Sequence, residues 1–154
     1  MPKYRTLNHT ELNELEKEFV DYLVVSGIDA DMWIKIKEDS PAKAVRIIEL
    51  FSDVVFEKIL RKTKYIFKVE NTTLFLFHYA EEMARLMIFQ FPDGFDLKEK
   101  TQQEIIAFVK ANRMQSIPQS KKFIRTREEE LFSMLQAGCD ICPKTFYESM
   151  IKQE

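Results

Sequence analysis

The chain is poor in residues that interrupt regular structure and in residues that build cross-linked scaffolds. Only three glycines occur among 154 residues, which excludes long turn-rich segments and favours helices and strands. Two cysteines are too few for a disulfide scaffold. No apolar run approaches the ~20 residues of a membrane helix, and no apolar stretch follows the first basic residues as in a signal peptide. These absences predict a cytoplasmic protein that does not enter a membrane.

Signatures of catalysis are missing as well. The sequence contains no GxGxxG, Walker A loop, GxSxG or HExxH pattern. Three consecutive acidic residues, 128–130, sit where a helix is expected to begin, and negative charge is favourable there without any catalytic role. We therefore expect no catalytic residue, no cofactor and no metal ligand. An enzyme is the less favoured interpretation.

The composition is typical of one folded domain with an aromatic-rich core. Hydrophobic residues make up 45% of the chain, charged residues make up 31%, and thirteen phenylalanines are present. A chain of 154 residues can bury roughly two thirds of its unfolded surface. We therefore expect a single domain over residues 1–154, without an interdomain linker.

Apolar residues recur at helical spacing on both sides of residues 65–91. Asn8 and Glu11 have the spacing of a capping box at the start of the first helix, and Gly27 is a natural left-handed stop. The segment 114–122, MQSIPQSKK, lacks a periodic pattern and is predicted to be a loop. The predicted helices cover residues 8–27, 29–39, 41–63, 96–113, 126–138 and 143–151, with Asp29, Asp96 and Thr126 as further caps.

Residues 65–91 are different, because their apolar residues alternate or run continuously as in strands. Strands are predicted near 64–70, 73–79 and 83–91, and their short connections indicate antiparallel neighbours. The predicted class is therefore α+β: N-terminal helices, a three-stranded antiparallel meander and C-terminal helices. The second strand is apolar on both faces, so both faces need a cover. The residues expected in the core are Phe51, Val55, Phe67, Phe75, Phe77 and Leu86.

A homodimer is one way to supply that cover. A three-stranded sheet leaves two edges unpaired, and two-fold dimers are the commonest soluble oligomers. The alternative is a monomer in which the last helix, with Phe146, Tyr147 and Met150, closes the second face. The sequence favours neither alternative strongly.

Cys139 and Cys142 form a CxxC pair followed by proline. Two thiols at this spacing can form a redox pair or share a metal. A zinc site needs four ligands, however, and the only histidines are His9 near the terminus and His78 inside a strand. A thioredoxin-type pair should also follow a strand, whereas this one follows a helix that stops near Gly138. We interpret both cysteines as small packed residues, with the redox pair as the alternative.

His78 lies in the second predicted strand beside apolar neighbours. A catalytic histidine needs an orienting partner and a substrate cleft. Glu81, Glu82 and Arg85 are close along the chain, but they belong to the next turn or strand. We therefore interpret His78 as a structural or partly exposed strand residue.

Basic residues are unevenly distributed. The net charge is -2, yet residues 110–127 hold six basic residues and no acidic one. Such a segment can contact the phosphates of a nucleic acid, although a solvated face is the commoner meaning of a basic run. The residues of this candidate nucleic-acid contact are Lys110, Arg113, Lys121, Lys122, Arg125 and Arg127.

Three stretches resemble a bacterial family of about this length that is catalogued as a domain of unknown function. They are LEKEFVDYLVVSGIDADMW at 15–33, IELFSDVVFEKILRKTKYI at 48–66 and LQAGCDI at 135–141. The strand region matches that family in pattern more than in residues. The resemblance implies a protein of unknown function and supplies no catalytic residue.

Three functions from different classes are compatible with these patterns. A non-enzymatic interaction or structural module is favoured, because catalytic signals are missing and the sheet has surplus apolar surface. A small-ligand binder or enzyme that uses the aromatic sheet face is the first alternative. A nucleic-acid accessory protein that uses residues 110–127 is the second alternative. The negative net charge of the chain disfavours nucleic acid as its partner.

Overall fold

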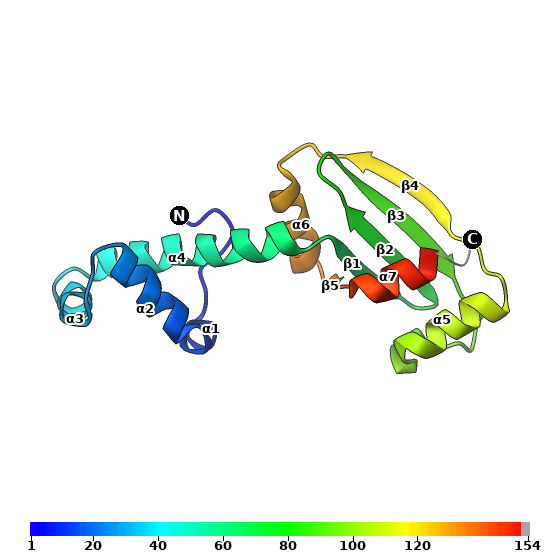
Figure 1. The fold of residues 1–154 in the computed structure, drawn as a ribbon, viewed down its shortest axis with the longest axis horizontal. Helices are drawn as coiled ribbons and strands as arrows, with labels where there is room; N and C mark the ends of the chain where they lie inside the picture. Colours follow the sequence, from blue (N-terminus) through cyan, green and yellow to red (C-terminus); the bar gives the residue numbers. More distant parts are fainter. Residues whose placement is uncertain (152–154) are drawn as a thin grey trace. The chain divides into compact units, whose positions relative to one another are not determined.

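A computed structural model describes residues 1–151 of the chain. These residues form two compact units, 1–59 and from Leu60 onward, and the boundary falls within the long helix α4 (Pro41–Lys62). Figure 1 labels the elements of both units. The single domain predicted from the sequence stays a prediction, and each unit is described separately below.

The first unit consists of helices. It contains α1 (His9–Glu14), α2 (Glu16–Val25), α3 (Ala30–Asp39) and most of α4. The capping box is confirmed, because the Asn8 side chain accepts from the backbone N–H of Glu11 and the Glu11 carboxylate accepts from that of Asn8. The predicted single helix over 8–27 is wrong in one respect: Leu15, at φ −106° and ψ 25°, separates α1 from α2. Gly27 has the expected positive φ of 82°.

Side chains from all parts of the first unit meet in one small core. Phe19 lies against Phe51, with ring centroids 5.0 Å apart, and Phe51 is buried as predicted. Ser52 ties the N-terminal segment to α4, because its hydroxyl accepts from the backbone N–H of Leu7 and donates to the carbonyl of Ile48. Val55 is only partly buried at the margin of this core.

The second unit is built on an antiparallel sheet of five strands in the order β4-β3-β2-β1-β5. The three central strands confirm the predicted meander. The prediction missed the two edge strands, because a six-residue strand whose side chains are all exposed has no apolar alternation. The strands are β1 (Tyr65–Glu70), β2 (Thr73–Tyr79), β3 (Met83–Gln90), β4 (Ile117–Lys122) and β5 (Asp140–Ile141).

The helices of the second unit follow the sheet in the chain. They are the 3-10 helix η1 (Leu97–Glu99), α5 (Gln102–Ala111), α6 (Arg127–Gln136) and α7 (Lys144–Ile151). The predicted helix over 96–113 is divided, because Asp96 caps η1 while the Thr101 hydroxyl caps α5. Thr126 caps α6 as predicted, by accepting from the backbone N–H of Glu129.

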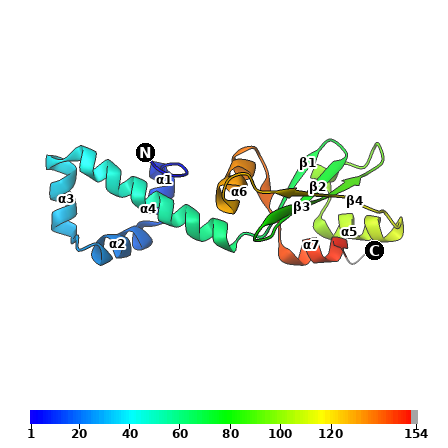
Figure 2. The same cartoon turned by 90° about the horizontal axis from the view of Figure 1, so that it is seen from above.

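Helices cover the two faces of this sheet unequally. α5 and α7 lie on one side, which we call the first face, and α6 lies on the opposite side, the second face (Figure 2). Leu74, Leu76 and Phe89 are buried on the first face among residues of α5 and α7. On the second face Ile66 and Tyr79 are buried. Phe75, Phe77 and Leu86 are only half-buried, so the prediction that these three are core residues was too strong. Phe67 is half-buried at the margin of the first-face core.

Candidate functional site

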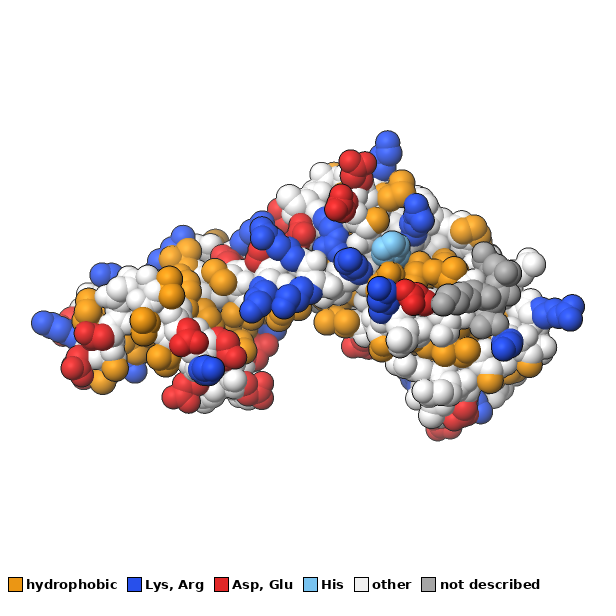
Figure 3. All heavy atoms as spheres, viewed as in Figure 1, with side chains coloured by type: hydrophobic (Ala, Val, Ile, Leu, Met, Phe, Trp, Pro, Cys, Tyr) orange, Lys and Arg blue, Asp and Glu red, His pale blue; other side chains and the backbone are white. Residues whose placement is uncertain are grey.

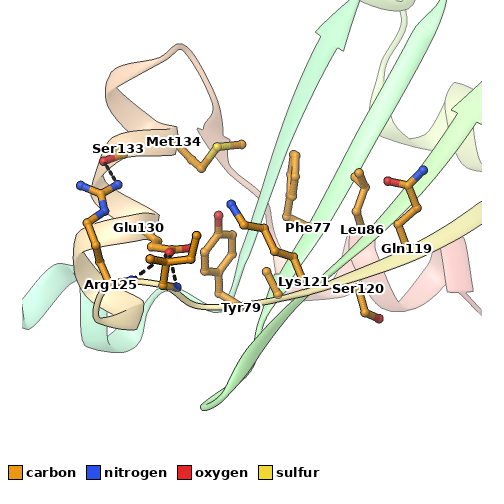
Figure 4. Close-up of a pocket in the computed structure, with 12 residues that line it drawn as sticks. Phe77, Tyr79, Leu86, Gln119, Ser120, Lys121, Arg125, Glu130, Ser133 and Met134 are labelled. Carbon is orange, nitrogen blue, oxygen red and sulfur yellow. Dashed lines mark hydrogen bonds between the residues drawn. The ribbon is translucent and has the colours of Figure 1, made fainter.

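A cavity of about 500 Å³ lies between the second face of the sheet and α6. Phe77, Tyr79, Ala84 and Leu86 form its floor. We call this cavity the α6 pocket, and Figure 4 shows its lining. The remaining lining residues come from β4, from the segment that joins β4 to α6, and from α6 itself: Gln119, Ser120, Lys121, Ile124, Arg125, Glu130, Ser133 and Met134.

The alternation of side chains along the strands explains the floor. Phe77 pairs with Leu86 across β2 and β3, and Tyr79 pairs with Ala84. Ala84 pairs on its other side with Lys121 of β4. Since Ala84 is the smallest side chain in this row, it leaves space between Tyr79 and Lys121. Ala84 therefore contributes to the space beneath α6.

Glu130 holds the wall of the pocket in place. Its side chain is 9% exposed, and one carboxylate oxygen accepts from the backbone N–H groups of Ile124 at 2.7 Å and Arg125 at 3.1 Å. Burial alone would raise the pKa of Glu130, but these hydrogen bonds and the nearby charges of Lys121 and Arg125 outweigh it and lower that pKa. The carboxylate is consequently ionised at neutral pH.

Tyr79 has the opposite character. Burial, reinforced by the charge of Glu130, raises the pKa of its phenol to about 12. Its ring stacks on Phe123, with centroids 5.6 Å apart and an interplanar angle of 17°. Tyr79 is therefore a neutral, fixed part of the pocket floor. A general acid or base works best with a pKa near the operating pH, and neither Tyr79 nor Glu130 meets that condition.

The structure distributes the six residues of the candidate nucleic-acid contact among separate places. Lys121 and Arg125 line the α6 pocket. Lys122 follows Lys121 on β4 and lies on the opposite face of the sheet, opposite Met83. Lys110 and Arg113 lie at and beyond the C-terminal end of α5, before β4 begins. The six residues thus do not form one continuous contact surface.

Arg127 has a structural position that the sequence did not indicate. Its guanidinium, 11% exposed, donates to the carbonyl of Leu60 at 3.0 Å, to that of Tyr79 at 3.0 and 3.1 Å, and to that of Thr63. One side chain therefore joins the last turn of α4, the end of β2 and the first turn of α6. It adds donors at the end of α4, where backbone N–H partners for the last carbonyls run out.

Cys139 and Cys142 flank β5, and both are free and buried. Cys139 closes a Schellman turn after α6, because its backbone N–H donates to the carbonyl of Met134. Burial raises the pKa of both thiols, that of Cys142 to about 11, which disfavours the reactive thiolate. Residues 1–151 contain no group of three or more His, Cys, Asp or Glu side chains placed to hold a metal ion.

Sequence reasoning missed three residues that shape the α6 pocket: Ala84, Glu130 and Met134. The apolar alternation of β2 correctly indicated a second apolar face. Nothing along the chain distinguished Glu130 from Glu128 and Glu129, because all three suit the start of a helix. The hydrogen bonds that select Glu130 come from a loop whose course depends on β4, an element that the sequence did not reveal.

The chain belongs to a family of unknown function (DUF6495), whose model matches residues 1–153. No curated protein and no solved structure matches it. Within the part of the chain that the structure describes, no helix is both long enough and apolar enough to cross a membrane. A candidate function therefore rests on the geometry of the chain itself.

Proposed function

We propose that the second unit is a non-enzymatic binding module, and that the α6 pocket holds a small molecule with an apolar body and one anionic group. The observation that carries this proposal is the pocket itself, about 500 Å³ in volume. Pockets for small ligands commonly measure roughly 300–1,000 Å³ and combine apolar walls with a few polar groups.

The floor and one wall account for the apolar body. Phe77 and Leu86 present half-buried side chains from β2 and β3, and Met134 faces them from α6. A ligand that covers these side chains removes apolar surface from water, which is favourable by roughly 25 cal/mol per Å². Methionine adapts readily to ligands of different shape. The pocket therefore suits a flat or branched hydrocarbon part.

The rim accounts for the anionic group. Lys121 extends from β4 over Tyr79 toward α6, and Arg125 stands beside α6 with its guanidinium on the hydroxyl of Ser133, at 2.8 Å (Figure 4). The one carboxylate of the lining, Glu130, already accepts two backbone hydrogen bonds. Two cations and one carboxylate leave one positive charge for the ligand to neutralise.

Binding without catalysis agrees with the titration of the lining. Glu130 is ionised and Tyr79 is protonated at neutral pH, so neither group is poised to transfer a proton. The proposal combines two hypotheses from the sequence: the non-enzymatic interaction module and the small-ligand binder that uses the aromatic sheet face.

Charge reversal on β4 tests the proposal with a matched control. Lys121→Glu changes the pocket rim, whereas Lys122→Glu makes the same change on the opposite face of the same strand. Anilinonaphthalene sulfonate is a suitable probe, because it combines an aromatic body with one sulfonate. We expect one saturable site, and about tenfold weaker binding for Lys121→Glu, equivalent to ~1.4 kcal/mol. Lys122→Glu should bind like the parent.

A second pair of variants tests the apolar part. Ala84→Leu fills the space between Tyr79 and Lys121, and Ala107→Leu adds the same bulk on the exposed surface of α5. Only Ala84→Leu should abolish probe binding while the melting temperature stays near that of the parent. Equal binding by both variants, or equal effects of the two lysine reversals, would show that the probe sits elsewhere and would refute the proposal.

The homodimer and the cytoplasmic location predicted from the sequence stay predictions. β4 carries Pro118, Lys121 and Lys122, residue types that discourage pairing at a sheet edge. Phe75 and Ile88, both half-buried on the second face, and Ile117, 58% exposed, provide apolar surface that a second copy could cover. A mass near 18.3 kDa that does not change with concentration in light scattering would exclude the dimer.

A further inference from the structure

A second cavity, of about 430 Å³, lies where the last turn of α4, the end of β2 and the start of α6 meet. We call it the cationic pocket, because basic side chains dominate its lining. It is distinct from the α6 pocket, and Tyr79 is the one residue common to both linings. The charged or titratable side chains that line it, besides Tyr79, are Arg61, Lys64, His78, Glu81, Arg127 and Glu128.

We propose that the cationic pocket binds the phosphate group of a small phosphorylated molecule. The proposal rests on the positions of four cations around His78, on the position of its ring, and on the way Arg127 alters the end of α4. It goes beyond the α6 pocket and uses none of the residues that we assign to recognition there.

The balance of charge around His78 is positive. Arg61, Lys64 and Arg127 line the pocket, and Arg85 pairs with His78 across β2 and β3. Two carboxylates, those of Glu81 and Glu128, oppose the three cations of the lining, which leaves the lining a net charge of +1, and Arg85 adds a further positive charge beside His78. Within residues 1–151, neither Lys64 nor Arg85 has a carboxylate partner in an ion pair. Figure 3 shows Lys and Arg side chains gathered beside a histidine over the sheet.

Arg127 removes an obstacle to anion binding at this place. A helix C-terminus carries partial negative charge on its free carbonyls and normally repels anions. Here the Arg127 guanidinium binds the carbonyls of Leu60 and Thr63 at the end of α4. The carbonyls are neutral groups and leave the charge of the guanidinium in place, while the Glu128 carboxylate at 3.5 Å balances part of it. The end of α4 thus carries a cation where its free carbonyls alone would repel an anion.

The His78 ring is held by aromatic neighbours. Its centroid lies 4.9 Å from that of Tyr65, with an interplanar angle of 28°, and 5.8 Å from that of Tyr147. Among the described residues, no group forms a hydrogen bond with its ring nitrogens. A ring that is fixed by stacking and has free nitrogens can donate to an incoming oxyanion with little loss of side-chain freedom.

The electrostatic surroundings of His78 agree with this assignment. Burial and the charges of Arg85, Lys64 and Arg127 all lower the pKa of His78. A bound dianion would oppose those charges and raise that pKa, so binding should strengthen as the pH falls through it. The charged and titratable groups around the ring come from α4, the segment before β1, β1, the β2–β3 turn, β3, α6 and α7: Arg61, Lys64, Tyr65, Glu81, Arg85, Arg127, Glu128 and Tyr147.

A phosphate group fits this set of donors better than a carboxylate. Lys64 supplies an ammonium with three rotatable donors, and the Arg85 guanidinium beside His78 has paired N–H donors of the kind that match two oxygens of a phosphate. A phosphate has three terminal oxygens and carries up to two negative charges. The positive lining and the neighbouring Arg85 together favour a group of that charge.

Histidine resonances provide a direct test in the full chain. The chain has two histidines, and His9 lies in the first unit, exposed, so it is an internal control. Inorganic pyrophosphate is titrated at constant ionic strength while the imidazole signals are followed by NMR. We expect a saturable shift of the His78 signal and a rise of its pKa, with no change for His9. If pyrophosphate moves the His78 signal no more than sodium chloride does, the proposal is wrong.

Two charge reversals complete the test. Lys64→Glu alters the lining, whereas Lys62→Glu places the same charge two residues earlier, outside the lining. We expect Lys64→Glu to weaken pyrophosphate binding about tenfold or more and Lys62→Glu to change it less than about threefold. Equal weakening by both would indicate general charge attraction and refute a defined site. Lys121→Glu in the α6 pocket should leave pyrophosphate binding unchanged, which keeps the two proposals separable.

Discussion

The two faces of the sheet are made by the same strands and yet differ in their packing. On the first face Leu74 and Leu76 of β2 are 1% and 0% exposed beneath α5 and α7. On the second face Phe75 and Phe77 of the same strand are only half-buried, and α6 leaves a cavity above part of them. Residues of equal hydrophobicity therefore stabilise the fold on one face and remain available for binding on the other.

The cause of this difference is the anchoring of the helices. α5 and α7 contribute apolar residues to one continuous core, among them Ile105, Val109, Phe146 and Met150. α6 contributes one fully buried apolar residue, Leu131. Its start is also held by polar contacts, through Arg127 to three carbonyls and through Glu130 to two backbone N–H groups. α6 thus depends more on polar contacts than α5 and α7 do.

Truncation of neighbouring residues on β2 should give the largest difference in stability between the two faces. Leu76→Ala removes a fully buried side chain, and we expect a loss of ~3–5 kcal/mol in the free energy of unfolding. Phe75→Ala should cost about half as much or less, because part of its ring remains in water in the parent. Urea denaturation measures both values. Equal losses would mean that the second face is packed as tightly as the first.

Loss of the Arg127 contacts should have the next largest effect. Arg127→Ala leaves the carbonyls of Leu60, Thr63 and Tyr79 without this donor, and we expect a cost of about 2–3 kcal/mol. Arg125→Ala, which removes a solvent-exposed hydrogen bond to the Ser133 hydroxyl, should cost ~0.5 kcal/mol or less. Thermal melts of the two variants give the comparison. A larger cost for Arg125→Ala would contradict the anchoring of α6 described above.

The pH dependence of stability tests whether the ionised Glu130 carboxylate holds the start of α6. The pKa of Glu130 is lowered in the folded chain, so its contribution is present above the ordinary glutamate value near 4.5 and is lost as the pH falls below it. We expect Glu130→Gln to cost ~1–2 kcal/mol at neutral pH and progressively less in acid. Denaturation at several pH values measures this difference. A cost that is the same at every pH would assign the effect to shape instead of charge.

The smallest expected difference concerns the two cysteines. Cys142 belongs to the first-face core, and burial raises its pKa to about 11. Cys139 is also buried, but its pKa is affected by Lys68 and Glu70, whose side chains alternate to the second face. We expect both thiols to react slowly with a thiol reagent at neutral pH, and Cys142 more slowly than Cys139. Reaction of either thiol as fast as in the urea-unfolded chain would show that the β5 region is open.

The sequence predicted the parts of the fold that depend on local rules. The capping box of Asn8, the left-handed turn at Gly27 and the cap at Thr126 require contacts within four or five residues, and all were recognisable. The central strands were recognisable because their apolar side chains recur at a period of two. The break at Leu15 was not, since both sides of it carry helical periodicity.

The sequence by itself therefore determined the α+β class, the three central strands and most helix ends. The tertiary structure decided the edge strands, the half-open second face and the role of each charged residue. β4 has no apolar pattern because neither of its faces is buried, so only its pairing with β3 makes it a strand. Arg127 and Lys121 look alike along the chain, but one binds buried carbonyls and the other lines a pocket. That difference arises from contacts across dozens of residues, and local periodicity carries no information about such contacts.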